Sequence, residues 1–122
     1  MSALDATHDP ARRSWVESAN GHPEFPIQNL PLGVFSPLAG APRGGIAIGD
    51  MILDLRAAAA EGLVDATAAG PALNAFLALG AGPRTALRHA VSALLDANAP
   101  PRPGLLHPAA DCLMYLPAHI GD

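Results

Sequence analysis

The sequence has no lysine, one cysteine and few aromatic residues, and these shortages exclude several classes of function. All seven basic residues are arginines, and only Arg12 and Arg13 are adjacent. Nucleic-acid binding needs a basic stripe that neutralises phosphates, and membrane-surface binding needs a cationic face. The chain has dispersed arginines and a formal net charge of −4. We therefore expect no nucleic-acid partner and no membrane partner.

Long apolar runs are also missing. No stretch approaches the roughly 20 apolar residues of a membrane span, and the first residues lack the basic-then-apolar pattern of a secretory signal. The single cysteine, Cys112, has no second cysteine with which to form an internal disulfide. It lies in an apolar run, which predicts a buried, unreactive thiol. Together these absences predict a cytoplasmic protein.

What the chain does contain is enough apolar sequence for one domain. With 122 residues and 50% hydrophobic content, it is expected to fold as a single globular unit that buries a modest core. Thirteen prolines and twelve glycines predict short elements joined by tight turns. Residues 1–13 are polar and aperiodic and are predicted to be a flexible lead-in, so that the domain covers residues 14–122.

The clearest local pattern is a hairpin at residues 45–55. Two short apolar stretches flank Gly49-Asp50, and a two-residue turn needs a positive φ that glycine adopts freely. Ile52 points to the opposite face, so both faces of the hairpin are expected to be covered. The turn pairs Ile48 with Met51 and Ile46 with Leu53, and it places on one face Ile46, Ile48, Met51, Leu53 and Leu55.

Helices are predicted after the hairpin. Asp54 has the residue type of an N-cap for a helix at 56–61, which Gly62 would end. Residues 71–80 carry a second helical pattern of apolar residues. The longest predicted helix begins at Pro83 and carries the apolar stripe Leu87, Ala90, Val91, Leu94 and Leu95.

Short strands are predicted on either side of the helices. Residues 25–32 form an extended, proline-containing strip, followed by a strand at 33–36. A last strand is predicted at 112–116. Near the beginning, a short helix at 14–20 carries Trp15, which is expected to anchor this arm by burying its large side chain.

Side chains of metal-ligand type gather near the end of the sequence. Their spacing fits neither a helical pair of histidines nor a calcium-binding loop, so we expect solvent-exposed polar residues. His89, beside the apolar stripe of the long helix, is expected to be a partly buried structural residue. From the residues themselves we therefore predict no catalytic, metal-binding or cofactor-binding side chain. The members of the gathered group are His107, Asp111, His119 and Asp122.

Three blocks of sequence, in this order, resemble a known family. They are residues 23–36 (PEFPIQNLPLGVFS), 45–55 (GIAIGDMILDL) and 116–122 (LPAHIGD), with support from the LNAF stretch at 73–76. This combination resembles the N-terminal domain of fumarylacetoacetases. The resemblance implies a mainly β fold with inserted helices (α+β), arranged as a small SH3-like, partly open barrel. In such a barrel the last strand returns beside the first ones, which would place residues 112–116 against the 45–55 hairpin.

The resemblance also implies a function for the parent protein. Fumarylacetoacetases hydrolyse 4-fumarylacetoacetate to fumarate and acetoacetate in tyrosine and phenylalanine breakdown. A Ca²⁺ or Mg²⁺ ion polarises the diketone, and a histidine assisted by a carboxylate activates water. In the family these groups come after the Gly-Asp pair that matches Gly121-Asp122. The resemblance therefore implies that the catalytic domain is absent from this chain, and it transfers no catalytic or metal-binding residue.

The role implied for this domain is structural or regulatory. Its expected partner is the C-terminal catalytic domain, within a full-length enzyme that forms a homodimer. Trp15 and Phe25 are the first candidates for an apolar patch that faces this partner. Two other interpretations stay open, an independent SH3-like binding module and a small hydrolase complete in itself. Five aromatic residues are few for the first, and missing ligand residues disfavour the second.

Overall fold

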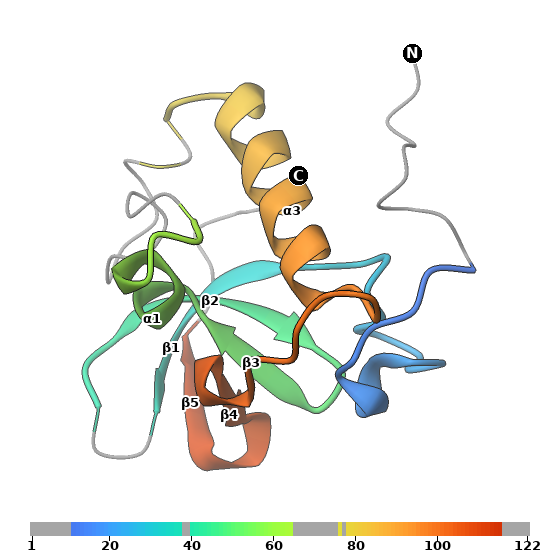
Figure 1. The fold of residues 1–122 in the computed structure, drawn as a ribbon. Helices are drawn as coiled ribbons and strands as arrows, with labels where there is room; N and C mark the ends of the chain where they lie inside the picture. Colours follow the sequence, from blue (N-terminus) through green and yellow to red (C-terminus); the bar gives the residue numbers. More distant parts are fainter. Residues whose placement is uncertain (1–10, 38–39, 65–75, 77, 116–122) are drawn as a thin grey trace.

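The computed structural model describes residues 11–37, 40–64, 76 and 78–115. These residues form a five-stranded antiparallel sheet in the order β4-β3-β2-β1-β5, which bends into a half-barrel (Figure 1). Short helices accompany the sheet, so the predicted α+β fold of a small, partly open barrel is confirmed. The strands are β1 (Leu32–Pro37), β2 (Arg43–Ile48), β3 (Met51–Asp54), β4 (Leu106–Pro108) and β5 (Cys112–Tyr115).

The predicted hairpin is confirmed in its turn and in its register. β2 and β3 pair antiparallel, with Ile48 opposite Met51 beside the turn and the following pairs in the predicted register. Gly49 has a φ of 58°, in the left-handed region that glycine enters without steric cost. A Cβ on Gly49 would lie 2.6 Å from the backbone nitrogen of Ala19. Backbone conformation and lack of space therefore both require glycine here.

The helix after the hairpin begins one residue earlier than predicted. Leu55 does not continue the strand face but opens α1 (Leu55–Ala60), where its side chain is buried. Asp54 is the N-cap, as predicted, and its carboxylate accepts hydrogen bonds from the backbone N–H groups of Arg56 and Ala57. Gly62, with a φ of 74°, follows the end of the helix.

The longest helix in the described part of the chain is α3 (Ala81–Leu95). It begins ahead of Pro83, which therefore lies in the first turn, where its missing N–H would have had no helical partner. The predicted apolar stripe faces the sheet: Leu87, Val91 and Leu95 are buried. None of the helices described is long and apolar enough to cross a membrane.

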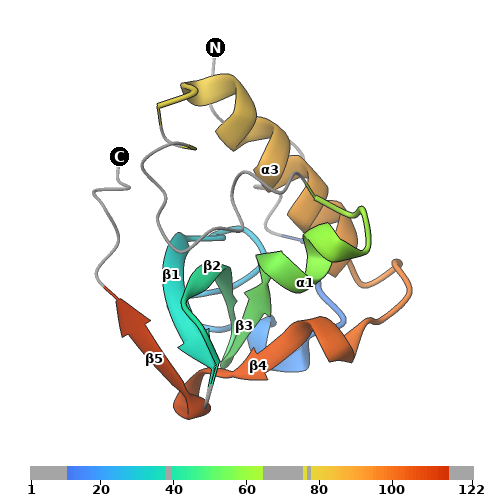
Figure 2. The ribbon, with the colours of Figure 1, turned by 90° about the vertical axis from the view of Figure 1, so that its left-hand side faces the viewer.

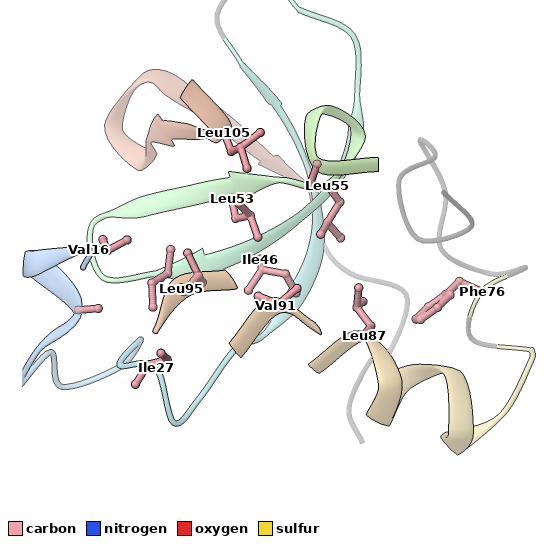
Figure 3. Packing of buried hydrophobic residues seen from close by; sticks show 13 residues of the cluster. Val16, Ile27, Ile46, Leu53, Leu55, Phe76, Leu87, Val91, Leu95 and Leu105 are labelled. Atoms are coloured by element: carbon pink, nitrogen blue, oxygen red, sulfur yellow. The ribbon is translucent and has the colours of Figure 1, made fainter. Parts of the chain in front are cut away.

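The core lies between α3, α1 and one face of the sheet. Figure 3 shows Leu87, Val91 and Leu95 of α3 gathered near Ile46 and Leu53 of the hairpin. Each fully buried aliphatic side chain contributes roughly 1.5–3 kcal/mol relative to an exposed one. This shared cluster therefore holds the helices onto the sheet. Further buried members from the N-terminal arm (residues 11–27), from α1 and from the loop before β4 are Val16, Ala19, Ile27, Leu55, Ala58 and Leu105.

The two edge strands correct the predicted topology. β5 does not lie against the hairpin, because β1 stands between them: Val34 of β1 pairs with Tyr115 of β5. The hairpin's outer neighbour is instead β4, a three-residue strand that was not predicted (Figure 2). In it His107 lies opposite Ile52 of β3. Such a short strand has no alternation long enough to be recognised in the sequence.

The N-terminal arm is tied to the far end of α3. The predicted helix at 14–20 is reduced to one 3₁₀ turn, Glu17–Ala19. Trp15 is half-buried, and its indole Nε1 donates to the carbonyl of Leu94 at 2.9 Å. The Ser14 hydroxyl donates to the carbonyl of Leu95 at 2.6 Å, and the Trp15 backbone N–H donates to the same oxygen. These bonds satisfy carbonyls that the last turn of a helix leaves without intrahelical partners.

Several predictions fall on residues outside those described. They are the lead-in at 1–10, most of the helix predicted at 71–80 and the block at 116–122. Residues 12 and 13, the end of the predicted lead-in, are hydrogen-bonded. Arg12 Nε donates to Asp96 Oδ2 at 2.8 Å, and the carbonyl of Arg13 accepts from the N–H of Ala97 at 2.8 Å.

Candidate functional site

Asp54 is the one charged side chain that is buried among the described residues, with 2% of its surface exposed. Its Oδ1 accepts hydrogen bonds from the backbone N–H groups of Arg56 at 3.0 Å and Ala57 at 3.1 Å. Its Oδ2 accepts from Arg43 Nη1 at 3.0 Å and lies 3.0 Å from His107 Nε2. A carboxylate can only accept, so His107 Nε2 carries the proton of this bond.

Three strands and one helix end bring these groups together. Asp54 closes β3 and caps α1, Arg43 opens β2 and His107 lies in the middle of β4. The ring of Phe35 in β1 packs beside His107, with centroids 5.6 Å apart and the planes tilted by 52°. We call Asp54, Arg43 and His107 the carboxylate cluster.

Opposing influences act on the pKa of Asp54. Burial, the largest single influence, raises it, but hydrogen bonds from His107, Ala57 and Arg43, with the charge of Arg43, together bring the pKa below its ordinary value. Asp54 is therefore ionised at neutral pH, and each of its oxygens already accepts two hydrogen bonds. No acceptor position is left to take a proton from a substrate, which suits a structural joint and not a general base.

A second, more exposed cluster fixes the tip of the hairpin. His22 Nδ1 accepts from the backbone N–H groups of Glu24 and Phe25, and His22 Nε2 lies 3.2 Å from Asp50 Oδ1. The carbonyl of Phe25 accepts from the N–H of Gly49 at 2.7 Å. Asp50 is 77% exposed, in contrast to Asp54. Hydrogen bonds from the arm therefore hold the Gly49-Asp50 turn of the hairpin in place.

Two of the grooves beside α3 run along its first half. The larger, of about 470 Å³, is lined by apolar side chains and Gly62 among the described residues, and it lies between the turn after α1 and the first half of α3. The second, of about 360 Å³, lies between residues 28–32 and α3 and includes Arg84 and Arg88. Leu87 and Phe76, which line both grooves, separate them. Neither groove includes a member of the carboxylate cluster.

Comparison with known proteins gives this fold a family. Residues 28–117 match the family model described as Fumarylacetoacetase N-terminal. The chain belongs to this family. The fumarylacetoacetase of Arabidopsis thaliana is 48% identical over 64 residues, which cover 46% of this chain and 15% of that protein. The protein of the same name from Oryza sativa is 51% identical over 67 residues, 52% of this chain and 14% of that protein.

The fumarylacetoacetase of Rattus norvegicus is 67% identical over a shorter stretch of 33 residues, 26% of this chain and 8% of that protein. The matched part of the chain thus spans at most 15% of the length of these relatives. The family match includes the carboxylate cluster and both grooves, whereas the arm with Trp15 and His22 lies ahead of it.

Within this fumarylacetoacetase N-terminal fold, the structure describes two members of the group of metal-ligand types, His107 and Asp111. His107 was expected to be exposed, and this was wrong: it is half-buried and bonded to Asp54. Asp111 is exposed, and His119 and Asp122 lie outside the described residues. In the part of the chain that is described, no three histidine, cysteine or acidic side chains are placed to share a metal ion.

Two other expectations meet the structure with different results. His89 was expected to be partly buried, but it is exposed on α3. Cys112 is half-buried, and its Sγ donates to the carbonyl of Pro108 at 3.4 Å. Burial, followed by the charges of Asp111 and Asp54, raises the pKa of the Cys112 thiol, so the unreactive protonated form is favoured.

Sequence reasoning missed the carboxylate cluster because its members are far apart. Asp54 was recognised as an N-cap, but His107 follows it by 53 positions and reaches it only through the pairing of β3 with β4. The one local signal was an aspartate flanked by Leu53 and Leu55, which indicates a buried carboxylate in need of a cationic partner.

Proposed function

We propose that this chain is the non-catalytic, structural and regulatory N-terminal domain of a fumarylacetoacetase. The full-length form would hydrolyse 4-fumarylacetoacetate to fumarate and acetoacetate in the breakdown of tyrosine and phenylalanine. Family membership over residues 28–117 and relatives that carry this name support the proposal. A cytoplasmic location is part of the same proposal.

The state of Asp54 is the observation that carries the non-catalytic role. A catalytic carboxylate must have a free oxygen that faces a substrate. In Asp54, by contrast, Oδ1 accepts the hydrogen bonds that cap α1, and Oδ2 accepts hydrogen bonds from Arg43 and His107. Its position at the junction of β2, β3, β4 and α1 explains a buried carboxylate without any reaction.

The metal chemistry of the full-length enzyme belongs to other residues in this proposal. A Ca²⁺ or Mg²⁺ ion takes six or more oxygen ligands, several of them carboxylates. Asp54 has no oxygen to give, and Asp50 lies beside His22 without a second carboxylate near it in the described part of the chain. In this proposal, therefore, the described residues neither hold such an ion nor take part in a catalytic step.

The C-terminal catalytic domain is the partner that we propose, within a homodimeric full-length enzyme. Large apolar side chains exposed among the described residues are Leu79 at 56% and Leu113 at 66%. Leu113 lies on the edge strand β5, close in sequence to the end of the described chain. Trp15 and Phe25, the candidates from the sequence, are both half-buried, so Leu113 replaces them as the first candidate for the contact.

The test separates a structural role from a chemical one. The 122-residue chain, incubated with the diketone substrate and Ca²⁺ or Mg²⁺, is expected to give no loss of diketone absorbance above a metal-free blank. In the full-length enzyme, Asp54→Asn is expected to lower the melting temperature and leave kcat unchanged well below that temperature. Turnover by the chain in proportion to its concentration, or a tenfold fall in kcat for folded Asp54→Asn, would contradict the proposal.

A further inference from the structure

The smaller groove beside α3 joins two arginines to an apolar floor. One wall is the extended segment 28–32 and the other is α3, which contributes Arg84, Leu87 and Arg88. Leu87 is almost fully buried and lies between Val91 and Phe76 in Figure 3. The groove of about 360 Å³ is within the range of small-molecule sites. Its floor and walls include the apolar side chains of Leu30, Leu32, Ile46, Phe76 and Leu87.

The two arginines are placed to act on one ligand. Residues four apart on a helix lie on the same face, with Cβ atoms about 5–6 Å apart. Arg84 Nε donates to the carbonyl of Gly80 at 3.3 Å, and its Nη groups have no hydrogen-bond partner among the described residues. Arg88 is half-buried at the groove and also interacts with another residue of the chain. The described lining contains no acidic residue, although the whole chain carries a net charge of −4.

From this arrangement we infer that the groove binds a small organic acid. Its carboxylate would meet the Arg84 and Arg88 guanidinium groups, and its apolar body would cover Leu32, Leu87 and Phe76. Guanidinium groups bind carboxylates through paired, charge-assisted hydrogen bonds. The apolar floor strengthens those bonds because it excludes water from one side. This inference goes beyond the proposed function, since it requires nothing from a catalytic domain.

The larger groove is a weaker candidate for such a ligand. Its lining in the described residues is apolar and carries no charged side chain that would orient a polar group. The smaller groove offers both the two arginines, which can bind a charged group, and an apolar surface, which can cover a hydrocarbon chain. An inorganic anion would contact only the arginines, and an uncharged amide of the same shape would gain only the apolar contact.

Titration calorimetry of the 122-residue chain with hexanoate, hexanamide and sulfate tests the inference. We expect saturable binding of hexanoate, with hexanamide and sulfate at least tenfold weaker. Arg84→Gln and Arg88→Gln should each weaken hexanoate binding about tenfold, or about 1.4 kcal/mol. The control is Arg56→Gln, which removes the same charge from an exposed position on α1, away from the groove. It should bind hexanoate like the parent.

Arg84 is exposed, so its variant should keep the parent's melting temperature and give a clean comparison even if Arg88→Gln is destabilised. Nitrogen-15 NMR spectra should show the largest hexanoate-induced shifts at residues 28–32 and 84–88. Absence of saturable hexanoate binding would overturn the inference. So would equal binding of hexanoate by Arg84→Gln and the parent, or sulfate binding as tight as hexanoate binding.

Discussion

Replacement of Asp54 by alanine should be among the most damaging single changes in this domain. The variant loses the N-cap of α1, worth about 1 kcal/mol. It also leaves Arg43, whose side chain is only 15% exposed, without the carboxylate with which it pairs. Hydrogen bonds to charged groups contribute roughly 1.5–3 kcal/mol each, and loss of one member of a buried pair costs roughly 3–5 kcal/mol. We expect a total of about 3–5 kcal/mol.

Asp54→Asn divides this loss into two parts. Asparagine is an equally good N-cap and has nearly the same shape, so the cap survives and only the charge is lost. We expect about 1–3 kcal/mol, measured by urea unfolding of both variants followed by circular dichroism. With a total stability of about 5–15 kcal/mol for a domain, Asp54→Ala would leave a substantial unfolded fraction at moderate temperature.

The control comes from the other aspartate–histidine pair among the described residues. Asp50 lies 3.2 Å from His22 but is 77% exposed, and surface ion pairs contribute at most about 1 kcal/mol. Asp50→Asn should therefore unfold within about 1 kcal/mol of the parent. If Asp54→Asn and Asp50→Asn lose the same stability, burial of the carboxylate cluster does not have the energetic role assigned to it.

Three further predictions concern pH, the hairpin and the β5 edge. Because the folded-state pKa of Asp54 is lowered, its stabilisation is complete above the unfolded value near 3.9 and is lost as pH falls through the folded value. The free energy of unfolding should therefore fall less steeply with decreasing pH in Asp54→Asn than in the parent, and identical pH profiles would refute this. Ile48→Ala should cost roughly 2–4 kcal/mol, and Gly49→Val should also destabilise, because its φ of 58° disfavours a β-branched residue. Parent-like melting of both would refute the hairpin's place in the core. Sedimentation should show concentration-dependent self-association that Leu113→Ser reduces, and a monomeric parent at all concentrations would refute that.

Local chemistry made part of this fold predictable. Gly49-Asp50 specifies a two-residue turn, and the turn alone then fixes which residues of β2 and β3 face each other. Asp54 before an alanine-rich stretch specifies a helix start, and the apolar spacing from Leu87 to Leu95 specifies which side of α3 faces the sheet. Each of these signals lies within a short stretch of consecutive residues.

The edge strands and both grooves depend on contacts that no local signal encodes. β4 has three residues, and β5 can pair with either edge of the hairpin meander on sequence alone. His107 next to a proline indicates a loop, and only its pairing with Ile52 of β3 and its bond to Asp54 show otherwise. The arginines of α3 form a groove only because the segment 28–32, over fifty positions earlier, runs beside them.

The arm that meets the end of α3 sets a limit on where this domain can be shortened. The last carbonyls of α3 accept from Ser14 and Trp15, about 80 positions earlier in the chain. A helix end whose acceptors lose their donors frays, and here the donors are not its sequence neighbours. Removal of residues up to Trp15 would therefore loosen the C-terminal turn of α3, although every residue of that helix is kept. In such a shortened chain, amide hydrogen exchange should accelerate first at Leu94 and Leu95, not at the new N-terminus.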